Sequence, residues 1–96
     1  MSKTWKIVTL DKAAAEIQLL VKNGYLTRDD QELIRVWSRE IVTYGVSHIL
    51  NSKKWNDHAQ DGNWRGFRSA SFSYSGIIIY KIIESRVVAE VVRITV

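Results

Sequence analysis

The sequence predicts a single α+β domain over residues 1–96, in the element order β-α-α-β-β-β, with a helical hairpin packed on a twisted antiparallel sheet. Three observations support this class. Apolar residues recur at helical spacing between capping residues in the first half of the chain. Short runs rich in β-branched residues fill the second half. The length of 96 residues is that of one domain.

The first two elements are a short strand and a helix. Residues 5–10 are β-branched and aromatic in character, which is typical of a strand. Asp11 is predicted to be the N-cap of a helix over 12–22, whose apolar residues share one face. Asn23 and Gly24 end this helix, because both tolerate the left-handed conformation of a C-cap.

A second, longer helix is predicted from Thr27 to Tyr44. Thr27 is a suitable N-cap, and Asp29 and Asp30 place negative charge in the first turn, where the helix dipole favours it. Gly45 ends the helix, and the short connection makes the two helices an antiparallel hairpin. The apolar face consists of Leu33, Ile34, Trp37, Ile41 and Tyr44.

The last part of the chain is predicted to be a three-stranded meander. Residues 46–62 look irregular, and strands follow over 64–73, 77–83 and 87–95 with short turns between them. Tyr80 is expected to pack against the helices, because it shares a strand face with two isoleucines. The tryptophans assigned to the core are Trp5, Trp37 and Trp64, while Trp55 is expected to anchor the irregular stretch.

Composition and charge exclude several classes of protein. The absence of cysteine excludes a disulfide scaffold, a cysteine-ligated metal site and thiol catalysis, and suits the cytoplasm. No apolar run reaches the ~18 residues of a membrane span, and no signal peptide is recognisable. The net charge of +4 lies mostly in the second half. This excess is compatible with an anionic partner such as RNA, or with a basic surface that only aids solubility.

A polar motif leads into the predicted meander. Residues 57–68 read D-H-x-x-x-G-x-W-R-G-F-R, and residues 79–81 read I-Y-K. Together with the element order, this pattern resembles the RelE superfamily of toxins from type II toxin–antitoxin systems, and within it the YafQ-like mRNA interferases. The resemblance implies a microbial-ribonuclease-like fold and cleavage of mRNA in the ribosomal A site. It also implies a small acidic antitoxin that wraps and blocks the toxin and through which the complex binds operator DNA.

The available side chains favour a metal-independent ribonuclease among the possible enzymes. Attack by a 2′-hydroxyl needs a base, cations that stabilise the phosphorane, and an acid for the leaving oxygen. The sequence has no HExxH motif and no glycine-rich phosphate loop, and we expect neither a metal nor a cofactor. Groups that suit this chemistry are His58, Arg65, Arg68, Arg93, Lys53 and Lys54.

The predicted catalytic residues are His58, Arg68 and Arg93. Relatives place a functional histidine at the position of His58, whose ordinary pKa suits acid–base work; the alternative is a surface histidine that caps a loop. Arg68 matches the arginine of the family motif, and Arg68 and Arg93 are expected to bind the scissile phosphate. His48 is interpreted as structural.

Five further residues are expected to bind RNA or the ribosome. Arg65 and Arg68 are expected on opposite faces of a regular strand, because side chains alternate along it. Arg65 is therefore assigned a lesser role, with a solvated residue or an antitoxin contact as the alternative. The five residues are Lys53, Lys54, Arg65, Tyr74 and Lys81.

Departures from the family pattern keep other functions open. Ile77 stands where many relatives carry an arginine, and Ser69 and Ser71 stand where YafQ-like toxins carry acidic or imidazole groups. Relatives usually continue past the last strand into a segment with His, Asp and Tyr, whereas this sequence stops at Val96. The alternatives are a non-enzymatic ParE-like inhibitor of DNA gyrase and a degenerate toxin that only binds its antitoxin.

Overall fold

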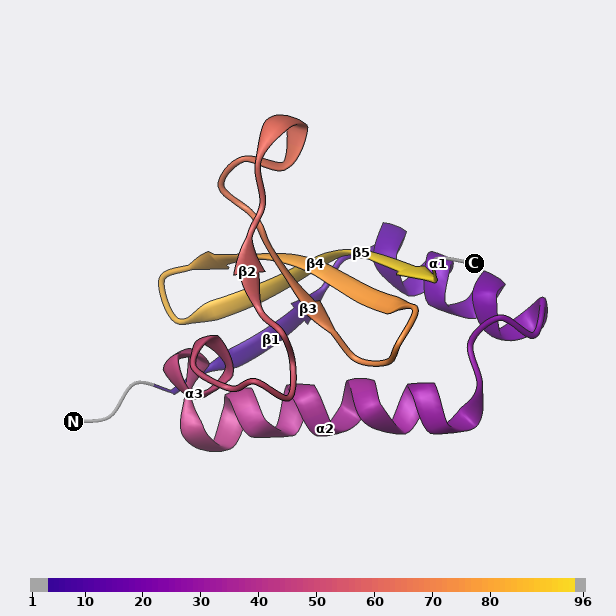
Figure 1. The fold of residues 1–96 in the computed structure, drawn as a ribbon, viewed down its shortest axis with the longest axis horizontal. Coiled ribbons are helices and arrows are strands. Elements are labelled where there is room, and N and C mark those ends of the chain that lie inside the picture. The colour runs from indigo at the N-terminus through magenta and orange to yellow at the C-terminus, as the bar shows by residue number, and fades with distance from the viewer. Residues whose placement is uncertain (1–3, 95–96) are drawn as a thin grey trace.

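A five-stranded sheet with a long helix on one side is the framework of the molecule (Figure 1). The computed structural model describes residues 4–94. Helix α2 (Arg28–Tyr44) runs along one face of the sheet, and the connection between the second and third strands rises on the other side. The strand order is β1-β5-β4-β3-β2. The strands are β1 (Lys6–Thr9), β2 (His58–Ala59), β3 (Arg68–Ser71), β4 (Gly76–Ile83) and β5 (Arg86–Ile94).

Both predicted helices are present, as α1 (Asp11–Lys22) and α2. The N-cap of α1 is Leu10 rather than Asp11, which is the first helical residue and still places its charge where the helix dipole favours it. Helix α2 begins with a capping box, as the Thr27 hydroxyl accepts from the Asp30 amide at 3.1 Å and the Asp30 carboxylate accepts from the Thr27 amide at 3.0 Å. The helix ends at Gly45.

The α+β class is confirmed, and so is the antiparallel pairing of β3, β4 and β5. Strand β1 differs, because it pairs parallel with β5, from Lys6 opposite Arg86 to Thr9 opposite Ala89. The sheet is therefore mixed, and the expected wholly antiparallel sheet is corrected at this strand. Hydrophobic periodicity marks a strand but does not say which neighbour it joins, so the parallel pair was not predictable from the pattern.

The core lies between the sheet and α2. Tyr80 points into the core with Ile78, as predicted, although the register with β5 shifts between Ile79 and Tyr80. Trp37 of α2 is buried and meets the Tyr80 ring edge-on, with 5.3 Å between ring centroids. Trp5, which precedes β1, packs against this core. Helix α1 continues past the end of β1 and packs along β5, where β1 no longer pairs.

Residues 46–62 are more ordered than the sequence suggested. They form α3 (Val46–Leu50) and the short strand β2, and a 3₁₀ turn (Gly62–Trp64) follows. The first meander strand therefore begins at Arg68 rather than at Trp64, and Trp64 is only partly buried and lies outside the core. Trp55 anchors this stretch as expected, with 1% of its surface exposed. Thr95 of the last predicted strand lies outside the described residues.

No helix within residues 4–94 has the length and hydropathy needed to cross a membrane.

Replacing Trp37 by alanine tests the predicted packing. Trp37→Ala should lower the free energy of unfolding by about 3–5 kcal/mol, because it removes a buried side chain and leaves a cavity beside Tyr80. Leu19→Ala on exposed α1 surface is the matched control and should change it by less than about 0.5 kcal/mol. Denaturant unfolding followed by circular dichroism measures both, and equal effects would contradict the assigned core.

Candidate active site on the outer face of the sheet

The face of the sheet opposite α2, called here the outer face, carries the side chains that could take part in catalysis or binding. His58 on β2 pairs with Ser69 on β3, which pairs in turn with Ile79 on β4, and Val91 on β5 completes this row. A neighbouring row consists of Ser71, Ile77 and Arg93. Lys81 lies on β4 two residues beyond Ile79, so it faces the same side.

Two aromatic rings lie among the outer-face cations. Trp64 and Phe67 come from the β2–β3 connection and meet edge-on, with 5.2 Å between centroids. The Lys81 ammonium lies 5.3 Å from the Phe67 centroid, and the Arg93 guanidinium carbon lies 5.9 Å from the Trp64 centroid. The outer face thus offers two flat rings, each with a cation beside it, which is a combination suited to single-stranded nucleic acid.

His58 is exposed, and both of its ring nitrogens have partners. Nδ1 lies 3.0 Å from the carbonyl oxygen of Asn56, and Nε2 lies 3.3 Å from the hydroxyl of Ser69. The side-chain amide of Gln60 donates to the same hydroxyl at 2.8 Å. The imidazole is therefore oriented by its neighbours, unlike that of a free surface histidine.

Strand spacing determines the distances between the Cα atoms of the outer-face residues. From about 4.8 Å between strands and about 3.4 Å per residue, the Cα atoms of His58 and Arg93 are separated by roughly 16 Å, and those of His58 and Lys81 by roughly 12 Å. Both side chains of a pair must extend toward Ile79 to reach one phosphate. Lys81 is thus better placed than Arg93 to act beside His58.

Arg68 lies on the other face of the sheet. It pairs with Tyr80 in the register of β3 and β4, and its Nε donates to the carboxylate of Asp57 at 2.6 Å. Tyr80 donates its hydroxyl to the same carboxylate, whose side chain has no exposed surface. Arg68 and His58 therefore do not share one site as expected, because their side chains lie on opposite faces of the sheet.

The protonation states of this cluster follow from its geometry. Burial, then the hydrogen bond and charge of Asp57, raise the pKa of Tyr80 well above its ordinary value of 10.0. The phenol therefore keeps its proton and donates a hydrogen bond to Asp57. Burial acts to lower the pKa of Arg68, but the hydrogen bond and charge of Asp57 outweigh it and raise the value. The carboxylate thus has a permanent cation and a permanent donor.

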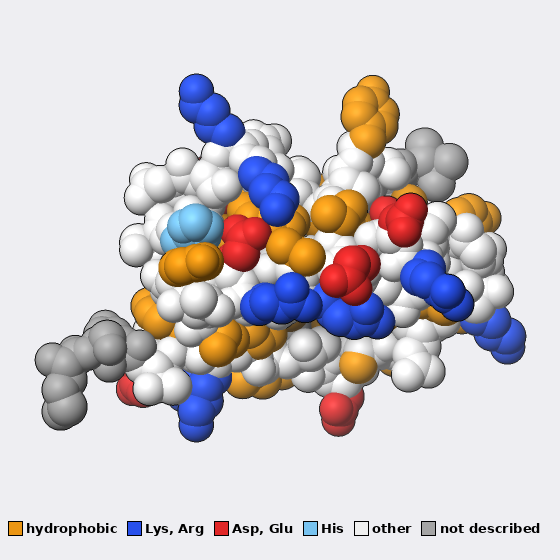
Figure 2. Space-filling view, turned by 90° about the horizontal axis from the view of Figure 1, so that it is seen from below, with side chains coloured by type: hydrophobic (Ala, Val, Ile, Leu, Met, Phe, Trp, Pro, Cys, Tyr) orange, Lys and Arg blue, Asp and Glu red, His pale blue; other side chains and the backbone are white. Residues whose placement is uncertain are grey.

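The remaining predicted residues are spread over other surfaces. Arg65 is exposed at the end of the 3₁₀ turn, so the argument from strand alternation does not apply to it. Tyr74 is fully exposed at the tip of the β3–β4 turn. Lys54 bonds to Glu40 of α2 at 3.3 Å and lies over the Trp55 ring, while Lys53 is exposed beside it. On the α2 side, Lys and Arg side chains are interspersed with Asp and Glu (Figure 2).

Two contributions could not be predicted from the sequence. The motif includes Asp57 but does not predict its contact with Arg68, which is the main polar contact between the loop before β2 and the sheet. Glu40 accepts from Trp55 at 3.0 Å, from His48 at 3.1 Å and from Lys54, which ties α2 to the same loop. Desolvation acts to raise the pKa of Glu40, and these hydrogen bonds, that of Trp55 first, lower it overall. This contact agrees with the structural interpretation of His48.

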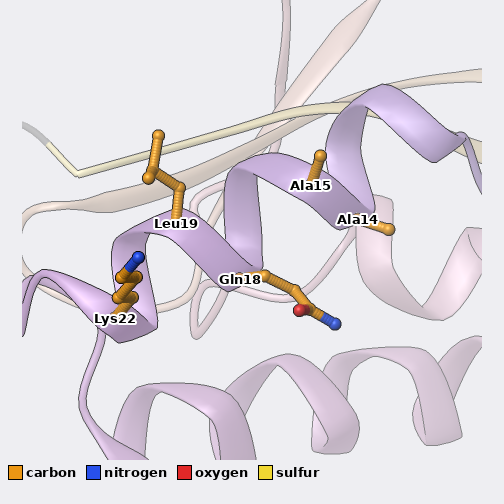
Figure 3. Close-up of a pocket in the computed structure, with 5 residues that line it drawn as sticks. All are labelled: Ala14, Ala15, Gln18, Leu19 and Lys22. Atoms are coloured by element: carbon orange, nitrogen blue, oxygen red, sulfur yellow. The ribbon is translucent and has the colours of Figure 1, made fainter.

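A hollow of about 570 Å³ along α1 carries none of the predicted site residues (Figure 3). Its lining is Ala14, Ala15, Gln18, Leu19 and Lys22. A smaller one, of about 280 Å³, separates α1 from the end of β5 and includes Leu19, Leu20 and Arg93. Among residues 4–94 no group of three His, Cys, Asp or Glu side chains could hold a metal ion.

The raised pKa of Tyr80 predicts a specific loss of stability in alkali. Above pH 10.0 the unfolded tyrosine ionises while the folded one does not, so the stability is lost as pH rises, by up to about 1.4 kcal/mol per pH unit. Tyr80→Phe should remove this part of the slope, and Tyr74→Phe, at an exposed site, should leave it unchanged. Urea unfolding from about pH 9 to 11 gives both slopes; a wild-type slope equal to that of Tyr80→Phe would disprove the assignment.

Comparison with known proteins identifies the fold. No protein-family model matches the sequence, and no curated protein matches it significantly. Solved structures do match. YafQ from E. coli strain BL21(DE3) has a TM-score of 0.74 at 17% identity, over 94% of this chain and 92% of that one. YafQ in the E. coli DinJ–YafQ toxin–antitoxin complex has a TM-score of 0.73 at 17% identity, over 96% and 93%.

A second group of similar structures comes from Staphylococcus aureus. The YoeB–YefM complex matches with a TM-score of 0.70 at 11% identity, over 98% of this chain and all of the other. These similarities extend over nearly the whole chain and include the sheet and its helices. The chain therefore has the fold of the YafQ and YoeB toxins, as the sequence pattern predicted.

Proposed function

We propose that residues 1–96 form a single toxin domain of a type II toxin–antitoxin system, which cleaves mRNA on the ribosome without a metal ion. The observation that carries this proposal is the outer face, where an oriented histidine shares one surface with two cations and two aromatic rings. The fold shared with YafQ and YoeB supports the class of toxin. Because this proposal has the protein act on ribosomes, it also implies a cytoplasmic location.

The geometry suits a division of labour among the outer-face groups. Nε2 of His58 takes the proton of the 2′-hydroxyl, whose oxygen attacks the adjacent phosphorus and forms a 2′,3′-cyclic phosphate. The bond to the 5′ oxygen breaks, and that oxygen takes up a proton. Arginine does not give up a proton in proteins, so Lys81 is the described outer-face cation that can act as this acid.

Arg93 and the aromatic pair bind the strand in this proposal. From its distance to His58, Arg93 contacts a phosphate next to the scissile one, while bases stack on Trp64 or Phe67. Arg68 supports the site from the core side through Asp57. Tyr74 and Arg65 are exposed near the ends of the outer-face strands. In this proposal they contact RNA or the ribosome, and Lys53 and Lys54 contact the ribosome.

A non-enzymatic toxin, such as a ParE-like gyrase inhibitor, is the second candidate. Two observations favour it: Arg68 is bound to Asp57 rather than facing His58, and Ser69 and Ser71 supply no acid–base group to the outer face. A protein of this kind would use the same outer face only for binding.

Cleavage of mRNA in a translating extract tests the enzymatic proposal. His58→Gln should lower the cleavage rate by about 10²–10⁴-fold as an acid–base group is lost. Lys81→Ala should lower it by about 10²–10⁴-fold as the general acid is lost, and Arg93→Ala by about 10–100-fold as a contact to the neighbouring phosphate is lost. Arg35→Ala, an exposed residue of α2 paired with Glu32, is the matched control and should cleave like the wild type. Primer extension locates the cuts.

Each outcome separates the candidates. New cuts within A-site codons that disappear in His58→Gln support the ribonuclease. Intact mRNA together with inhibited DNA supercoiling would overturn it in favour of the gyrase inhibitor. Full cleavage by both His58→Gln and Lys81→Ala would overturn the assigned roles while leaving the ribonuclease class in place.

The partner in this proposal is an acidic antitoxin with an amphipathic segment, through which the complex reaches operator DNA. The chain has a net charge of +4. The hollow between α1 and β5 offers apolar Leu19 and Leu20 beside the charge of Arg93, so an acidic apolar segment fits both features. Such a segment would also cover Arg93 of the outer face.

Replacing Leu19 by aspartate tests this docking surface. Leu19 is 59% exposed and lines both hollows of α1, so Leu19→Asp should weaken antitoxin binding by about 10–100-fold through lost apolar contact and added like charge. Val42→Asp, on exposed α2 surface, is the control and should bind normally. Isothermal titration with the protein encoded by the neighbouring gene measures both, and normal binding by Leu19→Asp would contradict the surface.

A further inference from the structure

We propose that Asn56 and Asp57 are positioning residues that hold His58 as the Nδ1–H tautomer, with the Nε2 lone pair on the outer face. The proposal rests on the function proposed above and deepens it, because it identifies the residues that keep Nε2 of His58 free to act as the base. It concerns two residues that contact no reacting atom: Asn56 contacts only the Nδ1 side of the His58 ring, and the side chain of Asp57 lies on the core side. The contacts around the loop that precedes β2 carry the argument.

The tautomer follows from the partner of Nδ1. The Asn56 carbonyl oxygen, 3.0 Å away, can only accept a hydrogen bond, so Nδ1 carries the proton. In the neutral ring the lone pair is then on Nε2. The Gln60 amide donates to the Ser69 hydroxyl, so that hydroxyl has its own proton free for Nε2, 3.3 Å away. A substrate 2′-hydroxyl that displaces Ser69 meets the same lone pair.

The carbonyl of Asn56 is directed by an unusual backbone conformation. Asn56 has φ of 44°, in the left-handed region that asparagine tolerates better than most residues. Its amide donates to the Lys53 carbonyl at 3.3 Å, which closes a turn before His58. A residue that rejects positive φ would rotate the carbonyl away from the imidazole.

Asp57 fixes this turn to the sheet. Its side chain is completely buried and is held by Arg68 from β3 and by Tyr80 from β4. The preceding Trp55 is held as well, since its carbonyl accepts from the Ser71 amide at 2.7 Å and its indole donates to Glu40. His58 follows directly and faces the opposite side, so its ring starts from a backbone anchored on the core side.

Nitrogen NMR of the full chain reads the tautomer directly and does not depend on cleavage. The chain has two histidines, and His48→Gln identifies the signals of His58. In the spectrum of the neutral ring, recorded at about pH 8.5, the wild type should show the proton mainly on Nδ1. Asn56→Gly keeps the carbonyl and accepts positive φ, so it should match the wild type. Asn56→Val should lower the ratio of Nδ1–H to Nε2–H by about 3–10-fold, the worth of one hydrogen bond.

The role of Asp57 is tested in the same experiment. Asp57→Asn should lower the tautomer ratio, and Asp61→Asn, an exposed acidic residue that follows β2, should not. If Asp57→Asn fails to fold, Tyr80→Phe removes one of the two hydrogen bonds to the carboxylate and should lower the ratio in a folded chain. A wild-type His58 that carries its proton on Nε2, or equal ratios in Asn56→Val and Asn56→Gly, would overturn the proposal.

The rate of mRNA cleavage is a second, independent measurement. Asn56→Val should cleave more slowly than Asn56→Gly at equal folded fraction. A wild type that cuts no mRNA but shows the Nδ1–H tautomer would refute the ribonuclease and leave the positioning intact. A wild type that cuts mRNA with the proton on Nε2 would do the opposite.

Discussion

The buried carboxylate of Asp57 is the interaction on which the arrangement of both sheet faces depends. A carboxylate without exposed surface must be paired, because the cost of an uncompensated buried charge exceeds that of most core defects. Its partners are Arg68 of β3 and Tyr80 of β4, the two strands that follow β2 in the order of the sheet. Satisfying this one charge therefore joins the loop, β3 and β4, and fixes which residues of β2 face outward.

Strand alternation then separates structural from chemical roles. On β4, Tyr80 completes the core against Trp37, while its neighbour Lys81 faces the opposite side beside Phe67. Ile79 and Val91 are almost completely buried although they belong to the outer face. An apolar floor under charged and aromatic groups excludes water from part of the surface, which strengthens electrostatic interactions there. The same sheet thus provides a core on one side and a polar, aromatic binding surface on the other.

The sequence predicts the elements better than their pairing. Helix α2 has its capping box, and Trp37, Ile41 and Tyr80 are in the core as expected, because local chemistry and periodicity determine these features. Tyr44, predicted on the same apolar face, is exposed at the end of the helix. The parallel partner of β1 depends on contacts distant in sequence, which periodicity does not encode. The face of Arg68 depends on the register of β2, where His58 pairs with Ser69 and Ala59 with Arg68. A slip of one residue would exchange the faces, so a motif alone cannot say whether Arg68 joins His58.

The position of β5 in the sheet has a consequence for how the chain folds during synthesis. Strand β5 lies between β1 and β4 and is the last of the described strands to leave the ribosome. Strand β1 has β5 as its sheet partner, so Lys6–Thr9 stay unpaired until residues 86–89 are available. Pairing across so long a stretch of chain is slow to form, because the entropy of loop closure is lost before the contacts are gained. The nascent chain therefore remains without its complete sheet through most of its translation, and the outer face, which needs Arg93 of the same strand, is assembled only at the end.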